Sequence, residues 1–311
     1  MSEKKYFSYF CDDVIRFLEN INKNRPDSIF DDPFLALHKK IHDKYGASFQ
    51  FNLFYQNDDG SFDLGMMTDA YKQEFEANSD WLRLGYHARK CYPDFPHLNA
   101  TYESVCRDFD DIVGNIIRFA GEKTFSDSSI THWVSLSKQA AQALADKGVK
   151  SVSCTAGVKD DRPEAKCALS SDHINILLAQ NEGVSKPSIA QLYINEVPGL
   201  PFLVNHNHLT PEQHKRFYGR IRFYRDPETG LFFNDFAGVT LNATPYEDIV
   251  GSLKALSEYE FVIPLMHEQY FYKDFYSYEP DYADKIELAF KTLLDLGYTH
   301  VPMYKLPMMQ Y

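Results

Sequence analysis

The fold is decided near the amino terminus by the stretch KKYFSYFCDDV, residues 4–14. Its aromatic run from Tyr6 to Phe10 predicts a short buried strand, and a helix-like run from Val14 to Ile21 follows almost at once. Asp12 and Asp13 therefore lie at the carboxyl end of a strand. In α/β folds that end opens onto the ligand crevice, so one carboxylate can hold a metal while the other takes a proton. The alternative is that either aspartate only caps the helix.

The remainder of the chain alternates strand-like and helix-like segments, which indicates an α/β fold with a largely parallel sheet. We interpret residues 1–311 as a single domain, because α/β barrels of this length are common. Residues from about 156 to 242 break the rhythm with many turn signals and predict a β-rich insertion or lid. Its run 205–208, Asn-His-Asn-His, is explained by loop polarity, since such a pair rarely binds metal without a third ligand.

Charge and composition exclude several classes of protein. The net charge of -12, with no basic stripe, argues against nucleic-acid and polyanionic partners. No window reaches the roughly 18 apolar residues of a membrane span, and the first residues lack a secretory signal, so we expect a cytoplasmic protein. The five cysteines include no CxxC pair, which argues against a disulfide framework or a zinc knuckle. Nothing in the sequence indicates the oligomeric state.

Titratable residues recur at the ends of four predicted strands. Packing has no reason to favour polar side chains there, and the carboxyl ends of parallel strands share one rim, so these residues are predicted to meet. Neutral imidazole is a common ligand for zinc. The residues at the strand ends are Asp12 and Asp13, His87, His132, and His267 with Glu268. The loop after His87 adds Cys91 and His97 as further candidate ligands.

These residues carry a resemblance to a known family. The run from Phe7 to Val14 resembles the Asp-Asp motif of the polysaccharide deacetylase superfamily, the metal-dependent carbohydrate esterases. Gly85-Tyr86-His87, then His132, then Leu265-Met266-His267 are similar to its later motifs, in the same order. Residues 28–35 and 42–47 resemble a divergent bacterial branch of that superfamily. The resemblance implies a distorted TIM-like barrel of about seven strands, (β/α)7, with the site at the carboxyl ends of the strands.

The resemblance also implies roles for single residues. Asp12 matches the family's general base, Asp13 its metal-binding aspartate, His87 its first metal histidine and His267 its general acid. The family's second metal histidine lies four residues after the first, and that position here is Cys91. A thiolate can bind zinc, so the predicted metal ligands are Asp13, His87 and Cys91.

Two alternatives complete the ligand set differently, because His97 or His132 can take the third place. The family's arginine-proline motif is not evident beside His132. The resemblance therefore implies a hydrolase that removes N- or O-linked acetyl groups from a carbohydrate with a divalent ion, expected to be zinc.

Two other functions stay open at this point. A metal-free glycoside hydrolase would use a carboxylate pair, such as Asp12 or Asp13 with Glu268. A catalytically inactive carbohydrate-binding barrel would keep the fold and lose the site, and Cys91 in place of histidine is the argument for it. The aromatic content, with 21 Tyr and 24 Phe, suits the faces of sugars in all three cases.

Overall fold

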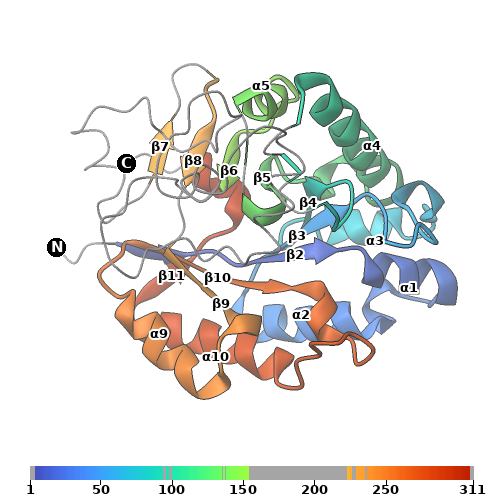
Figure 1. The fold of residues 1–311 in the computed structure, drawn as a ribbon. Helices are drawn as coiled ribbons and strands as arrows, with labels where there is room; N and C mark the ends of the chain where they lie inside the picture. Colours follow the sequence, from blue (N-terminus) through green and yellow to red (C-terminus); the bar gives the residue numbers. More distant parts are fainter. Residues whose placement is uncertain are drawn as a thin grey trace.

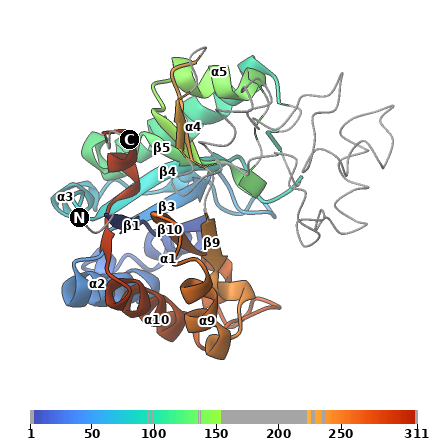
Figure 2. The same cartoon turned by 90° about the vertical axis from the view of Figure 1, so that its left-hand side faces the viewer.

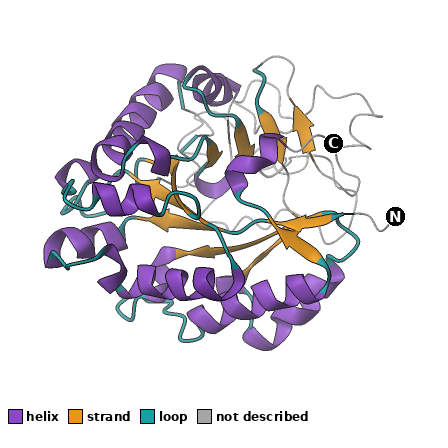
Figure 3. Cartoon of the chain, turned by 180° about the vertical axis from the view of Figure 1, so that it is seen from behind, coloured by secondary structure: helices purple, strands orange, loops and turns teal. Residues whose placement is uncertain are grey.

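A computed structural model of the chain describes residues 4–93, 96–97, 100–134, 136, 138–153, 223–225, 229–234 and 237–308 (Figure 1). Over these residues the protein has a mixed α/β fold, with mostly parallel strands inside and helices outside (Figure 3). The strands are β1 Lys5–Phe7, β2 Phe10–Val14, β3 Phe49–Phe54, β4 Leu82–Ala88, β5 Ser128–Ile130, β6 Ser151–Ser153, β7 Phe223–Arg225, β8 Phe232–Asn234, β9 Ala237–Thr240, β10 Phe261–His267 and β11 Tyr298–His300. The α-helices are α1 Arg16–Asn24, α2 Pro33–Tyr45, α3 Lys72–Ala77, α4 Tyr102–Ala120, α5 Lys138–Asp146, α9 Ile249–Ala255 and α10 Tyr282–Asp295.

The predicted strand Tyr6–Phe10 is longer than expected and is interrupted. β1 and β2 lie against β10 in one register, with Tyr6 opposite Phe261 and Phe10 opposite Leu265, so they are two halves of one strand. Between the halves, the Ser8 hydroxyl donates a hydrogen bond to the carbonyl of Val301. Asp12 and Asp13 therefore lie inside β2, near its carboxyl end, instead of just after a strand.

Parallel pairing arranges the strands into two sheets. In the larger sheet β9 pairs with β10, β10 with β1 and β2, β1 with β11, β2 with β3, and β3 with β4. In the smaller sheet the order is β5-β6-β8-β7, with only β7 antiparallel.

The two sheets meet where β5 lies beside β4. The amide of Ser126 donates to the carbonyl of Leu84 over 2.8 Å, and the Ser129 hydroxyl donates to the carbonyl of Tyr86 over 2.9 Å. Within the described residues no backbone pairing joins β8 to β9, so closure of the predicted barrel stays a prediction.

The helices cover the outside of the strands and form where the sequence carries caps. α2, α9 and α10 lie on one side of the larger sheet, and α4 and α5 lie on the opposite side (Figure 2). Asp32 caps α2, whose buried face includes Phe34 and Ile41, and Thr101 caps α4. Burying one such apolar side chain contributes about 1.5–3 kcal/mol, so the amphipathic pattern fixes which face of each helix meets the sheet.

Most of the predicted insertion lies outside the described residues, including the run 205–208. Its described part contains β7, β8 and β9, and the last two pair in parallel with β6 and β10. These two strands, and β7 through its antiparallel pairing with β8, therefore belong to the sheets. Among the described helices, none has the length and apolar character needed to span a membrane.

Candidate metal centre

A bulge in β2 turns the consecutive residues Asp12 and Asp13 toward the imidazole ring of His87. In a regular strand neighbouring side chains point to opposite faces, but the register between β2 and β3 shifts between Cys11 and Val14, and Asp13 has φ 59°. As a result Asp13 Oδ1 lies 3.1 Å from His87 Nε2, while Asp12 Oδ1 lies 4.0 Å from Nδ1 of the same ring. The sequence motif thus supplies two carboxylates to one site.

Three ligand atoms form a nearly equilateral triangle at this rim. Asp13 Oδ1, His87 Nε2 and His132 Nδ1 are 3.1 Å apart along all three edges. All three residues are buried, and among the described residues they form the one group of His, Cys, Asp and Glu with metal-site spacing. His132 follows β5, and β4 carries His87, so the neighbouring strands bring the two imidazoles together.

Hydrogen bonds behind the two imidazoles fix which nitrogens face the triangle. His87 Nδ1–H donates to the carbonyl of Ile130 over 2.5 Å, and His132 Nε2–H donates to the carbonyl of Cys91 over 2.9 Å. We assign the tautomers from these acceptors, because a carbonyl oxygen can only accept. The lone pairs of His87 Nε2 and His132 Nδ1 therefore point at each other and at the Asp13 carboxylate, an arrangement that a cation stabilises.

The triangle has the dimensions that a divalent ion requires. In a tetrahedral zinc site with bonds of about 2.0–2.1 Å, the ligand atoms lie about 3.3–3.4 Å apart, close to the 3.1 Å edges here. Two imidazoles and one carboxylate also match the ligand sets of catalytic zinc sites, which keep a fourth position open. Asp13, His87 and His132 therefore fit a divalent metal ion such as zinc.

Charges in the site move the pKa values in opposite directions. Burial alone raises the pKa of Asp13, but when a ring is protonated the positive charge of His132 and hydrogen bonds from His132 and His87 outweigh burial and hold that pKa well below its usual range. Burial lowers the pKa of His87, which keeps the ring neutral as a ligand. Burial also raises the pKa of Asp12 well above its usual value, and the neighbouring Asp13 charge adds to the rise. One carboxylate thus stays charged and the other is tuned to accept a proton.

Amide side chains position Asp12. Asn52 Nδ2 donates to Asp12 Oδ1 over 2.7 Å, Gln50 Nε2 donates to Asn52 Oδ1, and the Ser126 hydroxyl donates to Gln50 Oε1. Gly85 leaves room for them, because a Cβ there would lie 2.7 Å from Asn52 Oδ1. Sequence reasoning missed this network. The polar residues at alternate positions in a buried strand were the available signal.

His267 lies on the opposite flank of the aspartates, directly across from Asp12 in the register of β10 and β2. Its Nδ1 lies 3.0 Å from Asn242 Oδ1, so Nδ1–H donates to that oxygen and Nε2 is left for other partners. Gln269 Nε2 donates to Asp13 Oδ2 over 2.7 Å. Asn242 and Gln269 were also missed, because they follow predicted elements without any motif.

The third ligand predicted first, Cys91, is not the one that the structure brings to the triangle. His132, the stated alternative, takes that place, and Cys91 contributes its backbone carbonyl to orient His132. The reason is spatial: β5 lies beside β4, so a residue 45 positions away along the chain is closer than one four positions away.

Two other candidates have different partners. His97 Nε2 lies 2.7 Å from the Tyr86 hydroxyl, outside the triangle, and burial lowers the pKa of His97 to about 3. Glu268 is fully buried and accepts hydrogen bonds from the amides of Ile15, Arg16 and Phe17 at the start of α1. It is a helix cap, although burial raises its pKa to about 7.

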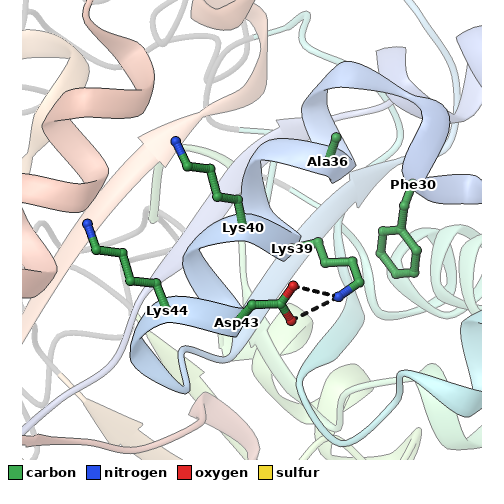
Figure 4. Close-up of a pocket in the computed structure, with 6 residues that line it drawn as sticks. All are labelled: Phe30, Ala36, Lys39, Lys40, Asp43 and Lys44. Carbon is green, nitrogen blue, oxygen red and sulfur yellow. Dashed lines mark hydrogen bonds and ion pairs between the residues drawn. The ribbon is translucent and has the colours of Figure 1, made fainter.

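A separate surface hollow of about 460 Å³ lies on α2, lined by Phe30, Ala36, Lys39, Lys40, Asp43 and Lys44 (Figure 4). Lys39 pairs with Asp43, and Lys44 pairs with Glu287. This hollow contains none of the predicted site residues. The triangle of Asp13, His87 and His132 is therefore the stronger candidate for the functional site.

One comparison with a solved structure agrees with this fold. No family model matches the sequence, and no curated protein matches it. Among solved structures, a 4-alpha-glucanotransferase from Thermococcus litoralis is similar, with a TM-score of 0.53 and 8% identity over 99% of this chain and 41% of that protein. A putative polysaccharide deacetylase from Mycobacterium smegmatis has a TM-score of 0.43 and 11% identity over 95% of this chain and 85% of that protein.

The first likeness shows a shared fold and nothing finer. The chain spans about two fifths of the glucanotransferase. The protein thus has a mixed α/β fold of a kind used by a carbohydrate-active enzyme, with a buried Asp-His-His group able to bind a metal.

Proposed function

We propose that the protein is a metal-dependent hydrolase that removes acetyl groups from a carbohydrate. The observation that carries the proposal is the triangle of Asp13 Oδ1, His87 Nε2 and His132 Nδ1, with Asp12 and His267 on its flanks. Asp13, His87 and His132 would hold the ion, for which zinc fits best by its preference for nitrogen and carboxylate ligands.

The chain's own residues divide the remaining chemistry. A bound divalent ion would polarise an acetyl carbonyl and offset the negative charge that develops on its oxygen. Asp12, whose pKa is raised by burial, takes the proton from the attacking water as general base. His267 acts as general acid in its imidazolium form: Nδ1–H stays on Asn242, and the second proton, on Nε2, goes to the leaving amine or alkoxide, which leaves the ring neutral.

The finer fold and domain predictions belong to the same proposal. The two sheets would close as a distorted (β/α)7 TIM-like barrel, with residues 1–311 as one domain and the segment from about 156 to 242 as its insertion. The meeting of β4 and β5 through Ser126 and Ser129 supports closure on that side.

The two alternatives have less support. A glycoside hydrolase needs two carboxylates facing the substrate, and Glu268 is instead enclosed by three backbone amides and the Tyr272 hydroxyl. An inactive sugar-binding barrel was suggested by Cys91, but Asp13, His87 and His132 supply three ligand atoms with metal-site spacing without it.

The test is hydrolysis of acetylated oligosaccharides by zinc-loaded protein. We expect acetate release that stops with EDTA and returns with added zinc, and a loss of about 10²–10⁴-fold in kcat for Asp12→Asn with bound metal retained. Cleavage of glycosidic bonds that survives EDTA would reject the proposal in favour of the hydrolase with a carboxylate pair.

A further inference from the structure

Two groups of aromatic side chains flank the metal triangle from opposite sides. One is Trp133, which directly follows the ligand His132; their ring centroids are 5.9 Å apart. The other runs outward from His267 through Tyr270, Phe275 and Tyr276, with successive ring centroids 6.1, 5.0 and 4.4 Å apart. We call them the Trp133 platform and the Tyr276 platform.

The Trp133 platform has an unusual backbone. Trp133 has φ 60° and ψ 21°, a left-handed conformation that bulky side chains rarely adopt, and its side chain is still 37% exposed. Such strain at a site is retained when the surroundings fix the residue, and it is common where ligands bind. Here it follows immediately after a residue that the triangle holds in place.

The Tyr276 platform is presented by an ordered loop. The amide of Glu279 donates to the carbonyl of Tyr270, which closes the loop, and Arg16 pairs with Asp274 inside it. Tyr276 nevertheless leaves 88% of its surface exposed. The fold thus exposes the Tyr276 ring to solvent at the end of a row of contacting rings that begins at His267.

Strand order places the platforms on either side of the aspartates. β10, which leads to the Tyr276 platform, pairs directly with β2, whereas β5, which leads to Trp133, lies beyond β3 and β4 on the other side. A ligand that touches both platforms would therefore span strands on both sides of β2, which carries Asp12 and Asp13.

We propose that the site binds an extended, uncharged glycan whose sugar rings stack on Trp133 and on Tyr276, with the acetylated unit between them. This rests on the proposed function, which makes the substrate a carbohydrate. Flat rings suit the apolar faces of sugars, and the net charge of -12 disfavours a polyanionic glycan. The platforms then favour long chains over single sugars.

The sequence allows a direct binding test because it contains two tryptophans. Trp81 is only 5% exposed and stacks on His42, so Trp81→Phe leaves Trp133 as the sole indole. This variant is titrated in EDTA, where no turnover is expected, with N-acetylglucosamine and its β-1,4-linked pentamer, and with xylose and an O-acetylated xylose pentamer. Tryptophan emission is the readout.

We expect at least one pentamer to shift the Trp133 emission and to bind at least about tenfold more tightly than its monomer. Adding Tyr276→Ala is expected to weaken pentamer binding about 5–10-fold and leave the monomer unchanged, in line with ring-stacking energies of about 1–3 kcal/mol. Leu294→Ala, which truncates a 39% exposed side chain on α10, is the control and is expected to have no effect.

Equal affinities for monomers and pentamers, no shift of the Trp133 emission, or pentamer binding unchanged by Tyr276→Ala would overturn the inference. Its failure is distinct from that of the proposed function. Pentamer binding without acetate release under any metal would remove the deacetylase and leave the platforms. Acetate release at the same rate from monomers and pentamers would do the reverse.

Discussion

The role of Glu268 gives the sharpest prediction about the limits of the site. Its carboxylate accepts the amides of Ile15, Arg16 and Phe17 over 2.7, 2.8 and 2.6 Å, and the Tyr272 hydroxyl over 3.0 Å. Glu268→Ala leaves these amides without an acceptor, and each unsatisfied buried donor costs about 1–3 kcal/mol. We therefore expect a loss of about 3–6 kcal/mol in the free energy of unfolding.

Glu268→Gln separates structure from catalysis. Glutamine keeps the shape of the side chain and one acceptor oxygen, but its NH₂ group would face backbone N–H donors. We expect the free energy of unfolding to fall by about 1–3 kcal/mol and the specific activity per folded molecule to stay normal. Urea unfolding and acetate release are measured on the same samples. Asp274→Asn serves as the control. It weakens the exposed ion pair with Arg16, a residue of α1, and is expected to lower the free energy of unfolding by less than about 1 kcal/mol. A Glu268→Gln protein of wild-type stability and no activity would refute the capping role.

Two further predictions concern a buried histidine and the support of the base. Burial lowers the pKa of His38 to about 4. Between pH 6.5 and 4 this histidine is therefore protonated in the unfolded chain and neutral in the folded one. The free energy of unfolding is expected to fall by up to about 3 kcal/mol over that range. His38→Phe, which fits among the rings of Phe34 and Phe49, is expected to remove that loss in urea unfolding at pH 7 and 4.5, and equal pH slopes would contradict it. Asn52→Leu removes the amide that donates to Asp12; we expect kcat to fall about 10–100-fold at unchanged zinc content, and loss of the zinc would show a structural role instead.

The general layout of the site can be predicted from the sequence because it follows from strand ends. Apolar runs that stop at Asp12, His87 and His267 identify the strands, and parallel strands share a rim. Helices with clear caps, such as α2 between Asp32 and Gly46, are equally predictable. Strand ends and helix caps depend on residues that are close together in the chain, so they can be predicted from a single sequence.

The parts that could not be predicted depend on which strands are neighbours. His132 replaces Cys91 in the triangle because β5 lies beside β4, and the sequence does not specify that pairing. The bulge that turns Asp13 is likewise a matter of register with β3. Asn52 and Gln269 are ordinary polar residues until the fold brings them to the aspartates.

The most direct test of the account is the zinc content of four proteins after loading with zinc and dialysis, measured by elemental analysis. Wild type and Cys91→Ser are expected to retain about one ion per chain. Asp13→Asn and His132→Ala are expected to lose it, because the first removes the negative charge of the triangle and the second removes one of its ligand atoms. Zinc retained by His132→Ala and lost by Cys91→Ser, or a wild-type protein that binds none, would contradict the proposed metal centre.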